Sequence, residues 1–580
     1  MSFSSIRSIA TSSLSAAQYQ MSVASSNVAN ADTEGYTRKT ATQAAVVTSG
    51  VGTGVTITAV TSSVDKYLVK DLVGAASELG AAEATASFTE SLQALYGSTS
   101  GSEDGGTSLA NSLVSLESAI ASLAATPESD TLKAQAVGAL DAVASQLRET
   151  SAGIQGLRAD ADGQIEDSVT SVNDALNTIA SLNDQIAAAS ARGESTADLE
   201  DLRNTALQTI AGEMDVSYYV NSDNQMRIYT TGGTTLLDSK VHELSYAAAG
   251  TVTADTVFGA ITVDGKDVTS QITSGEIGAL LTLRDETLPA SQDELDALAS
   301  GLIEQLNAAY NAGSAVPAPE TLTGSTSFTA SDSFSATGTL RVALTDEEGA
   351  LSSYTDLDLS AYGSIDEVVS ALDAVDGLSA SLDAAGHLVL SSDTAGLGVS
   401  LADIDVSVGS DGQGFSATFG MNDLLTGTGA SNVAVCSDIL AQPGTLATGG
   451  LSTAATLTAG DTVVSSGESA VAQALSEALT GETSFAAAGR LAAGSKTFAD
   501  YASAVVADAA SLATSASSDL TNKETVQQTL SDLFASQTGV NLDEETARLS
   551  ELEQQYSTAA QLLQVLNAMF DALLEAAQSA

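Results

Sequence analysis

The sequence predicts an α+β protein that is predominantly α-helical, with long coiled-coil-like terminal helices, a helical shell and an inserted, mostly β outer domain. Both ends of the chain carry apolar residues at an alternating spacing of three and four, which is typical of helices that pack along a seam. Two internal stretches instead repeat with a strand-like period of two. Pro317 and Pro319 separate the second of these stretches from the helical pattern before it, so they mark a domain boundary.

The first helix is predicted over the first thirty residues, where one face alternates large and small side chains. The large side chains are Leu14, Met21 and Val28, and the small ones are Ala10, Ala17 and Ala24. Such a face can lie close against a leucine-rich helix, because the alanines leave room for larger side chains. Asn30 suits the C-terminus of this helix, and Gly35 suits a turn position with positive φ.

The segment after this turn is predicted to contain a hairpin and then helices. Residues 46–60 alternate Val, Thr, Gly and Ile, which indicates an extended segment or a hairpin. Helical pattern follows over residues 64–96, 109–123 and 129–157. Pro127 interrupts this pattern, because the residue before a proline disfavours α geometry.

A heptad rhythm continues from Ile165 to Ile186, with polar Asn183 on the seam as a possible register device. From Asp215 the period becomes strand-like, and Asn-Ser-Asp-Asn and Gly-Gly turns separate short apolar runs. These runs predict one small antiparallel sheet with strands at residues 216–220, 226–229 and 234–237.

Helix is predicted again from Ile277 to Asn311, and the composition changes after the two prolines. Residues 314–485 are rich in Ser, Thr, Gly and Asp, and we interpret them as the mostly β domain. Its strands are expected at residues 340–344, 388–390, 399–408 and 415–419. Helical pattern resumes near Phe498 and runs to Leu533, so the chain leaves a helical core and comes back to it.

The last helix is predicted to begin near Leu542. Asn541 can cap it, and Glu544 stands three residues later, as in a capping box. No Gly or Pro follows Gly539, so the helix is a rod of roughly 50 to 60 Å at about 1.5 Å per residue. Its seam, which has a single polar member, consists of Leu542, Glu545, Leu549, Leu552, Tyr556, Ala559, Leu563, Leu566, Phe570 and Leu573. A seam of this length must be covered by another helix or by other chains.

Three domains are therefore expected. Residues 1–35 and 540–580 form a terminal-helix core, residues 36–313 and 486–539 a mainly helical shell with the small sheet, and residues 314–485 the inserted outer domain. Because the two terminal helices offer complementary faces, both ends of the chain are expected at one end of the protein.

Charge excludes two classes of partner. The 580 residues include 19 Lys and Arg against 73 Asp and Glu, which gives a formal net charge of −54. A field of this sign repels nucleic acid and anionic membrane surfaces. No segment resembles a membrane span or a cleaved secretory signal, so neither membrane insertion nor general secretion is expected.

Catalytic patterns are missing from the sequence. The only histidines, His242 and His387, lie far apart and in different predicted domains. The single cysteine, Cys436, has no sequence neighbour that would activate it and cannot form an intramolecular disulfide. We therefore expect no enzyme activity and no catalytic, cofactor or metal site.

Motifs at the two ends of the chain resemble those of the flagellar axial proteins, the family of rod, hook and junction proteins. The first motif is Ser-Asn-Val-Ala-Asn-Ala-Asp-Thr-Glu-Gly-Tyr-Thr-Arg-Lys at Ser26–Lys39, and the second is Ser-Gln-Thr-Gly-Val-Asn-Leu-Asp-Glu-Glu at Ser536–Glu545. Three internal segments echo the same family in the same order: Leu182–Ile186, Asp201–Asn204 and Gly278–Asp285. The resemblance covers about residues 1–313 and 486–580, and it is greatest to the hook-associated junction members.

This resemblance implies a structural adaptor at the junction between flagellar hook and filament, which assembles through its terminal helices. The implied partners are other copies of the chain in a ring or helical lattice, the hook protein, the next hook-associated junction protein and an export chaperone at the C-terminal helix. Export through the flagellar type III apparatus without a cleaved signal is implied as well. The expected assembly interface comprises Leu14, Met21, Val28, Asn30, Gly35, Tyr36, Arg38, Leu549, Leu552, Tyr556, Leu563, Leu566, Phe570 and Leu573.

Three alternatives remain open. Hook and rod proteins share the first motif but typically continue Gly-Phe-Lys, whereas this chain has Gly-Tyr-Thr-Arg at Gly35–Arg38. An acidic cell-surface adhesin could use residues 314–485 to bind a ligand, but it would need its own secretion signal and anchor. A hydrolase carried to the cell surface would need a catalytic site in the same region.

Overall fold

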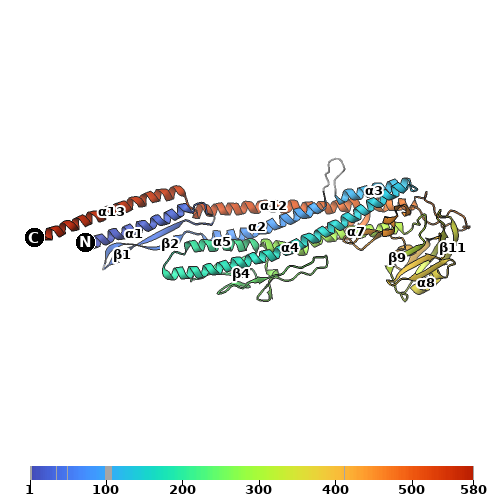
Figure 1. Ribbon diagram of the computed structural model, residues 1–580, viewed down its shortest axis with the longest axis horizontal. Helices are drawn as coiled ribbons and strands as arrows, with labels where there is room; N and C mark the ends of the chain where they lie inside the picture. The colour runs from blue at the N-terminus through green and yellow to red at the C-terminus, as the bar shows by residue number, and fades with distance from the viewer. Residues whose placement is uncertain (1–2, 34, 49, 98–107, 411, 579–580) are drawn as a thin grey trace. The chain divides into compact units, whose positions relative to one another are not determined.

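The structure, a computed structural model, describes residues 3–33, 35–48, 50–97, 108–410 and 412–578 (Figure 1). The predicted α+β class with predominant helix is confirmed. The chain folds into two compact units, of which the first comprises Met1–Phe88, Ala159–Arg284 and Thr514–Ala580, and the second Thr89–Arg158 and Asp285–Ala513. Within the described part of the chain, no helix combines the length and the apolar character that a membrane crossing requires.

The terminal helices of the first unit pair with each other. α1 (Phe3–Ala29) packs against α13 (Leu542–Gln578), which begins at the predicted residue. The Asn541 side chain caps α13 by accepting hydrogen bonds from the backbone N–H groups of Asp543 and Glu544 at 3.0 and 3.3 Å. The other helices with residues in this unit are α2 (Lys66–Leu95), α4 (Asp130–Arg192), α5 (Ala197–Glu213), α6 (Gly275–Thr282) and α12 (Phe498–Thr538).

The predicted hairpin is confirmed and is longer than the pattern suggested. β1 (Lys39–Thr48) pairs antiparallel with β2 (Val51–Ser62) as a sheet of two strands. The small sheet is also confirmed, in the order β3 (Val216–Val220), β4 (Met226–Thr230) and β5 (Thr235–Leu237). A second small sheet, which the sequence did not predict, joins β6 (Leu244–Ser245), β7 (Thr262–Val263) and β8 (Lys266–Asp267).

The core of the second unit lies among helices. They are α3 (Leu109–Ala125), the first part of α4, α7 (Leu288–Tyr310), α11 (Ala470–Thr480) and the first part of α12. α3 and α4 are separate, as the proline break predicted, and the two helical stretches expected after the break form one continuous α4. The short elements around this core are β15 (Leu425–Thr426), β16 (Ala434–Val435), α10 (Ser437–Ala441), β17 (Thr483–Phe485) and β18 (Gly494–Lys496).

A separate apolar core in the second unit lies between two sheets of three strands. One sheet has the order β11 (Leu351–Asp358), β10 (Ala336–Thr345) and β14 (Gly398–Val408). The other has the order β12 (Leu378–Leu382), β13 (His387–Ser392) and β9 (Thr321–Ser327). α8 (Ile365–Asp373) contributes Ile365, Val368 and Leu372 to this core.

One predicted strand of this region is wrong, because residues 415–419 form the short helix α9 (Phe415–Phe419). Phe415 and Phe419 are one helical turn apart, both are fully buried, and their ring centroids lie 4.5 Å from each other. Backbone N–H groups at the start of the helix donate to the Asp403 carboxylate on β14. Two aromatic residues four apart satisfy a strand pattern and a helix pattern equally, and the partner on β14 decides between them.

The inserted region is divided among three apolar cores, the smallest of which joins Leu451, Val463 and Val464 to Ala343 and Leu351. Residues between Leu322 and Met421 build the core of the sheets. Most of the buried apolar residues between Leu424 and Leu479, among them Val471, pack into the same core as α3 and α7. The domain boundaries expected at residues 314 and 485 remain a prediction.

Candidate assembly site at the root of the terminal helices

A polar cluster with a buried centre lies in the first unit, where the end of α1, the loop after it, α5 and the start of α13 meet. We call it the root cluster. It consists of Asn27, Tyr36, Thr37, Arg38, Lys39, Asp201, Glu544 and Glu545. Its members come from the first motif, the second motif and one internal echo of the sequence.

Asn27 is the centre of the root cluster. Its Oδ1 accepts hydrogen bonds from the Tyr36 hydroxyl and from the Lys39 backbone N–H, both at 2.9 Å. Its Nδ2 donates to the Lys39 carbonyl at 2.9 Å and to Glu545 Oε2 at 3.2 Å. Since Asn27 is only 1% exposed, this one amide joins α1, the first strand and α13 away from water.

Arg38 connects the loop to the start of α13. Its Nε and Nη2 each lie 2.6 Å from Glu545 Oε1, and its Nη1 lies 3.3 Å from Glu544 Oε2. Its backbone N–H donates to the Thr538 carbonyl at the end of α12 at 2.7 Å. Glu544, expected to complete a capping box, therefore pairs with Arg38, and Glu545, the polar exception in the seam, is the buried partner of this arginine.

Lys39 and Asp201 connect the same loop to α5. The two side chains form an ion pair in which both are almost fully buried, and Lys39 Nζ also lies 3.3 Å from Asp198 Oδ1. The Asp201 carboxylate accepts the Thr37 backbone N–H at 2.9 Å and the Thr37 hydroxyl at 2.8 Å. Lys39 Nζ stands 3.8 Å from the centre of the Tyr36 ring, and burial raises the pKa of the Tyr36 phenol.

The predicted turn residues shape the loop that carries these side chains. Asn30 caps the end of α1, since its Nδ2 donates to the Ser26 carbonyl at 3.0 Å. Gly35 has φ +74°, and a Cβ built there would lie 2.7 Å from Thr205 Oγ1 on α5. Glycine is needed both for this backbone conformation and for the close approach to α5.

The predicted seam residues divide into three classes. Leu552 and Leu566 are buried against α1 within the unit. Phe570 and Leu573, at 55% and 54% exposed, are open to solvent. The half-buried class comprises Leu14, Met21, Val28, Leu549, Tyr556 and Leu563.

On α1 the structure buries the small side chains rather than the large ones. Ala10, Ala17 and Ala24 are each 3% exposed or less. Alanine lets two helix backbones approach closely, and the larger side chains then flank the contact. Gln20 and Asn27, which are seven residues apart, are buried as well. Asn27 extends this row of buried side chains on α1 into the root cluster.

Four important members of the root cluster were not predicted: Asn27, Lys39, Asp201 and Glu545. Glu545 was detectable, since it is the one charged side chain in an apolar seam. Asp201 was detectable only as the first residue of an internal echo. Asn27 and Lys39 stood inside the first motif without a periodic signal, and their role depends on contacts with distant residues.

The internal segments that resemble the family also form buried polar contacts with one another and with their neighbours in the first unit. Arg203 Nη1 donates to Asn183 Oδ1 at 3.1 Å and to the Asn224 carbonyl at 2.6 Å. Asn183 in turn exchanges two hydrogen bonds with the backbone of Met226 on β4, so it fixes the sheet on α4. Arg284 Nη1 lies 2.8 Å from Asp162 Oδ1, and both side chains are buried.

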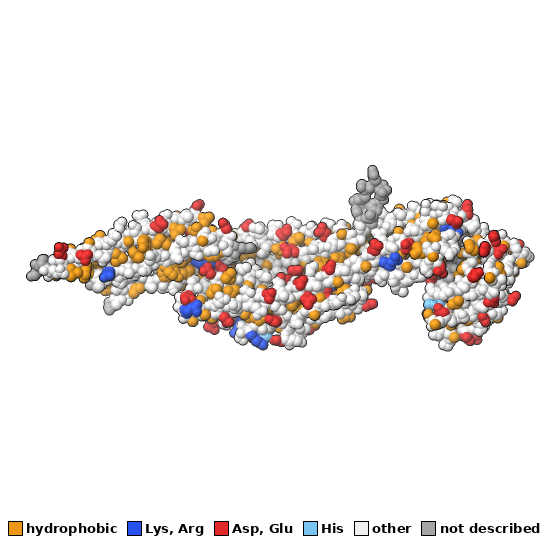
Figure 2. Space-filling view, viewed as in Figure 1, with side chains coloured by type: hydrophobic (Ala, Val, Ile, Leu, Met, Phe, Trp, Pro, Cys, Tyr) orange, Lys and Arg blue, Asp and Glu red, His pale blue; other side chains and the backbone are white. Residues whose placement is uncertain are grey.

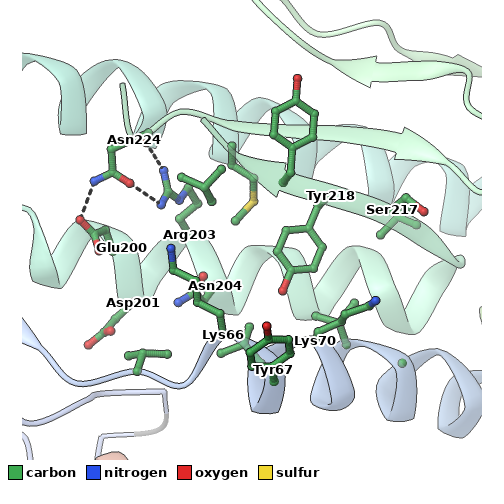
Figure 3. Close-up of a pocket in the computed structure, with 18 of the residues that line it drawn as sticks. Lys66, Tyr67, Lys70, Glu200, Asp201, Arg203, Asn204, Ser217, Tyr218 and Asn224 are labelled. Atoms are coloured by element: carbon green, nitrogen blue, oxygen red, sulfur yellow. Dashed lines mark hydrogen bonds between the residues drawn. The ribbon is translucent and has the colours of Figure 1, made fainter. Parts of the chain in front are cut away.

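A cavity of about 780 Å³ lies beside the root cluster in the same unit (Figure 3). Its walls come from the start of α2, from α5 and from β3, and include Lys66, Lys70, Asp201 and Tyr218. Among the described residues, no group of three or more His, Cys, Asp or Glu side chains is placed to hold a metal ion. Both polar and apolar side chains line the cavity, and their arrangement does not identify a reaction.

Three family models match the chain. The model described as flagellar hook-associated protein FlgK helical domain matches residues 99–323. The models described as flagella basal body rod protein and flagellar basal body rod FlgEFG protein C-terminal match residues 8–37 and 534–576. The two terminal matches contain Asn27 and Glu545 of the root cluster.

Individual relatives agree with these matches. Flagellar hook-associated protein 1 of Escherichia coli (strain K12) is 25% identical over 587 residues, which covers 98% of this chain and 99% of the relative. The protein of that name from Salmonella typhimurium (strain LT2) is 26% identical over 325 residues, or 53% of this chain and 57% of the relative. The solved structure of the flagellar hook junction protein FlgK from Burkholderia pseudomallei aligns with a TM-score of 0.46 and 15% identity, covering 80% of this chain and 98% of the other.

Proposed function

The chain belongs to the family of flagellar hook-associated protein 1, and from that premise we propose that it is a structural adaptor at the junction between hook and filament. The observation that carries this proposal is the root cluster, in which half-buried Arg38 of the first terminal motif forms an ion pair with the buried Glu545 of the second. The cluster joins the two ends of the chain into one helical element. Such an element can enter an axial lattice as a unit.

The proposed partners follow from the resemblance and from the surfaces of α13. Other copies of the chain lie beside it, the hook protein lies on one side, and the next hook-associated junction protein lies on the other. Val565, Met569 and Leu573 of α13 are at least half exposed. We propose that an export chaperone covers this segment before assembly, and that the chain leaves the cell through the flagellar export apparatus.

Imaging of the tagged chain on isolated flagella tests the function. A band confined to the hook–filament junction is expected. Label along the whole hook or filament would instead indicate that the chain is a hook, rod or filament protein. Label on the cell surface without flagella would select an adhesin and overturn the proposal.

A charge on the exposed part of α13 tests whether this helix enters the lattice. We expect Leu573→Asp to prevent attachment to hooks while both units stay folded, because the new charge is buried only after assembly. Val257→Asp is the matched control, since Val257 is 94% exposed in the same unit. Adding the purified variants to isolated hooks separates attachment from export, and normal attachment of Leu573→Asp would contradict this role of α13.

A further inference from the structure

α1 is the middle layer of the terminal-helix element, with α13 and the β1–β2 hairpin on different sides of it (Figure 1). The contact with the hairpin is close, since the Val55 N–H on β2 donates to Ser12 Oγ of α1 at 3.2 Å. A Cβ added at Gly54 would collide with Ser12. α1 therefore covers β2 and leaves the outer edge of β1 open.

The first exposed surface is this hairpin, which we call the hairpin surface. The side chains of β1 from Thr42 to Thr48 are all exposed, and Val47 is 60% exposed. Among the strands that the structure describes, β1 pairs only with β2. A ribbon of two strands is marginally stable in water, and an uncharged open strand is a surface for further packing.

The second exposed surface lies at the end of α13, which extends past the start of α1 (Figure 1). Figure 2 shows apolar side chains running along this helix. We call this the tip surface, and it comprises Leu562, Val565, Met569, Phe570, Leu573 and Leu574, all between 43% and 60% exposed. Four of these six residues, Leu562, Val565, Met569 and Phe570, lie in a run without charge from Gln554 to Phe570.

Charge limits where two copies can meet. The whole chain carries −54, yet no residue from Thr40 to Val64 is charged. Copies of the same net charge repel each other over most of their surface. The hairpin surface and most of the tip surface are therefore places where a second copy can approach without that repulsion.

We propose that the tip surface of one copy packs against the hairpin surface of the next. This inference rests on the proposed function, in which copies of the chain assemble with one another. The two surfaces are unlike and lie on different sides of α1, so the contact is heterologous. A heterologous contact leaves a free tip and a free hairpin on every pair, and assembly continues into a ring or a filament.

Disulfide cross-linking tests which surfaces meet. In a Cys436→Ser background, Val47→Cys or Val51→Cys is placed in one copy and Val565→Cys or Leu573→Cys in the other. The mixed proteins are attached to isolated hooks and oxidised. We expect mixed dimers between at least one hairpin cysteine and one tip cysteine. Two outcomes would overturn the inference. One is a disulfide between the Val47→Cys positions of two copies, and the other is the absence of any mixed dimer in the attached protein.

Charge reversal provides a second, independent test. Val47→Asp should lower the amount of chain bound to hooks by at least about tenfold, because a carboxylate would be buried in the contact. Val565→Lys in the same chain should restore part of the binding, since it places a positive charge on the tip surface that meets the negatively charged hairpin surface. Val257→Asp again serves as the control.

The outcomes separate this inference from the proposed function. Wild-type chain that never attaches to hooks contradicts the function itself. Chain that attaches normally despite Val47→Asp, without mixed cross-links, contradicts only the contact between tip and hairpin.

Discussion

Arg38 is the side chain whose removal tests the root cluster most directly. Arg38→Ala leaves the buried Glu545 carboxylate without its charged partner, and because Arg38 itself is 34% exposed, the cost should be about 1 to 3 kcal/mol. We expect faster amide exchange around the start of α13 in this variant. Arg192→Ala is the control, because Arg192 and Glu194 form an ion pair that is exposed to solvent and therefore contributes little to stability. Equal effects of the two substitutions would show that the cluster does not hold the helices.

Glu294 in the second unit couples stability to pH. Its side chain is buried, the Arg490 backbone N–H donates to its Oε1 at 2.8 Å, and burial raises its pKa to about 7. Arg490 opposes this shift, while the nearby Asp508 and Asp293 add to it. Because the folded-state pKa lies above the ordinary value, folding disfavours the charged form.

The contribution of Glu294 to the free energy of unfolding should therefore rise as the pH falls through 7 and level off below the ordinary carboxyl pKa of 4.5. We expect the unfolding free energy of the wild type, minus that of Glu294→Gln, to increase from about pH 8 to about pH 5. Chemical unfolding at several pH values measures this difference. A constant difference across that range would contradict the prediction.

At the scale of elements, the pairing of α1 with α13 depends on small side chains. Ala17 is 3% exposed in the column that meets α13. Ala17→Leu should force the helices apart and weaken their pairing by about 1 to 3 kcal/mol. Ser15→Leu, on the exposed side of α1, should have little effect. Amide exchange of both helices measures the change, and similar exchange in the two variants would contradict this packing.

Long elements were predictable from the sequence because their apolar period repeats over many residues. α13 begins at the predicted Leu542, and the break at Pro127 separates α3 from α4. The short helix α9 was mispredicted because five residues contain too few repeats to distinguish the two periods. Its conformation is set by a contact with Asp403, which is distant in the sequence.

The candidate site was only partly predictable for a similar reason. Gly35, Tyr36 and Arg38 were identified through a family motif, and the structure places them in or beside the root cluster. Asn27 and Asp201 also lie in segments that resemble the family, but their roles were not predicted, because a buried polar residue is recognisable as such only once its partners are known. Phe570 and Leu573 are exposed, and their role in an assembly interface remains a prediction.

At the scale of the whole molecule, the core of the two sheets can be removed with little strain on the chain. Its two ends are adjacent, since the Asn422 N–H donates to Asn311 Oδ1 at 3.0 Å and Asn422 Nδ2 to the Gly313 carbonyl at 2.9 Å. A short Gly/Ser linker in place of residues 316–421 should therefore close at low entropic cost. We expect this variant to keep the helical core of the second unit and to attach to hooks.

Electron microscopy of hooks incubated with the deletion variant measures attachment, and circular dichroism confirms its helical content. We expect filaments that form but respond abnormally under load. A deletion variant that is folded and exported, yet never found on hooks, would place part of the docking surface in the two sheets.

The root cluster also has a mechanical consequence. α13 has 37 residues, so at about 1.5 Å per residue its far end lies roughly 55 Å from the cluster. A helix pair fixed at one end and free at the other is a cantilever. A sideways force at the free end exerts a torque that the short-range bonds of Arg38, Asn27 and Asp201 must balance over a much smaller distance. Bending of the joint would therefore strain these few side chains first, well before it strains the apolar contacts along the helices.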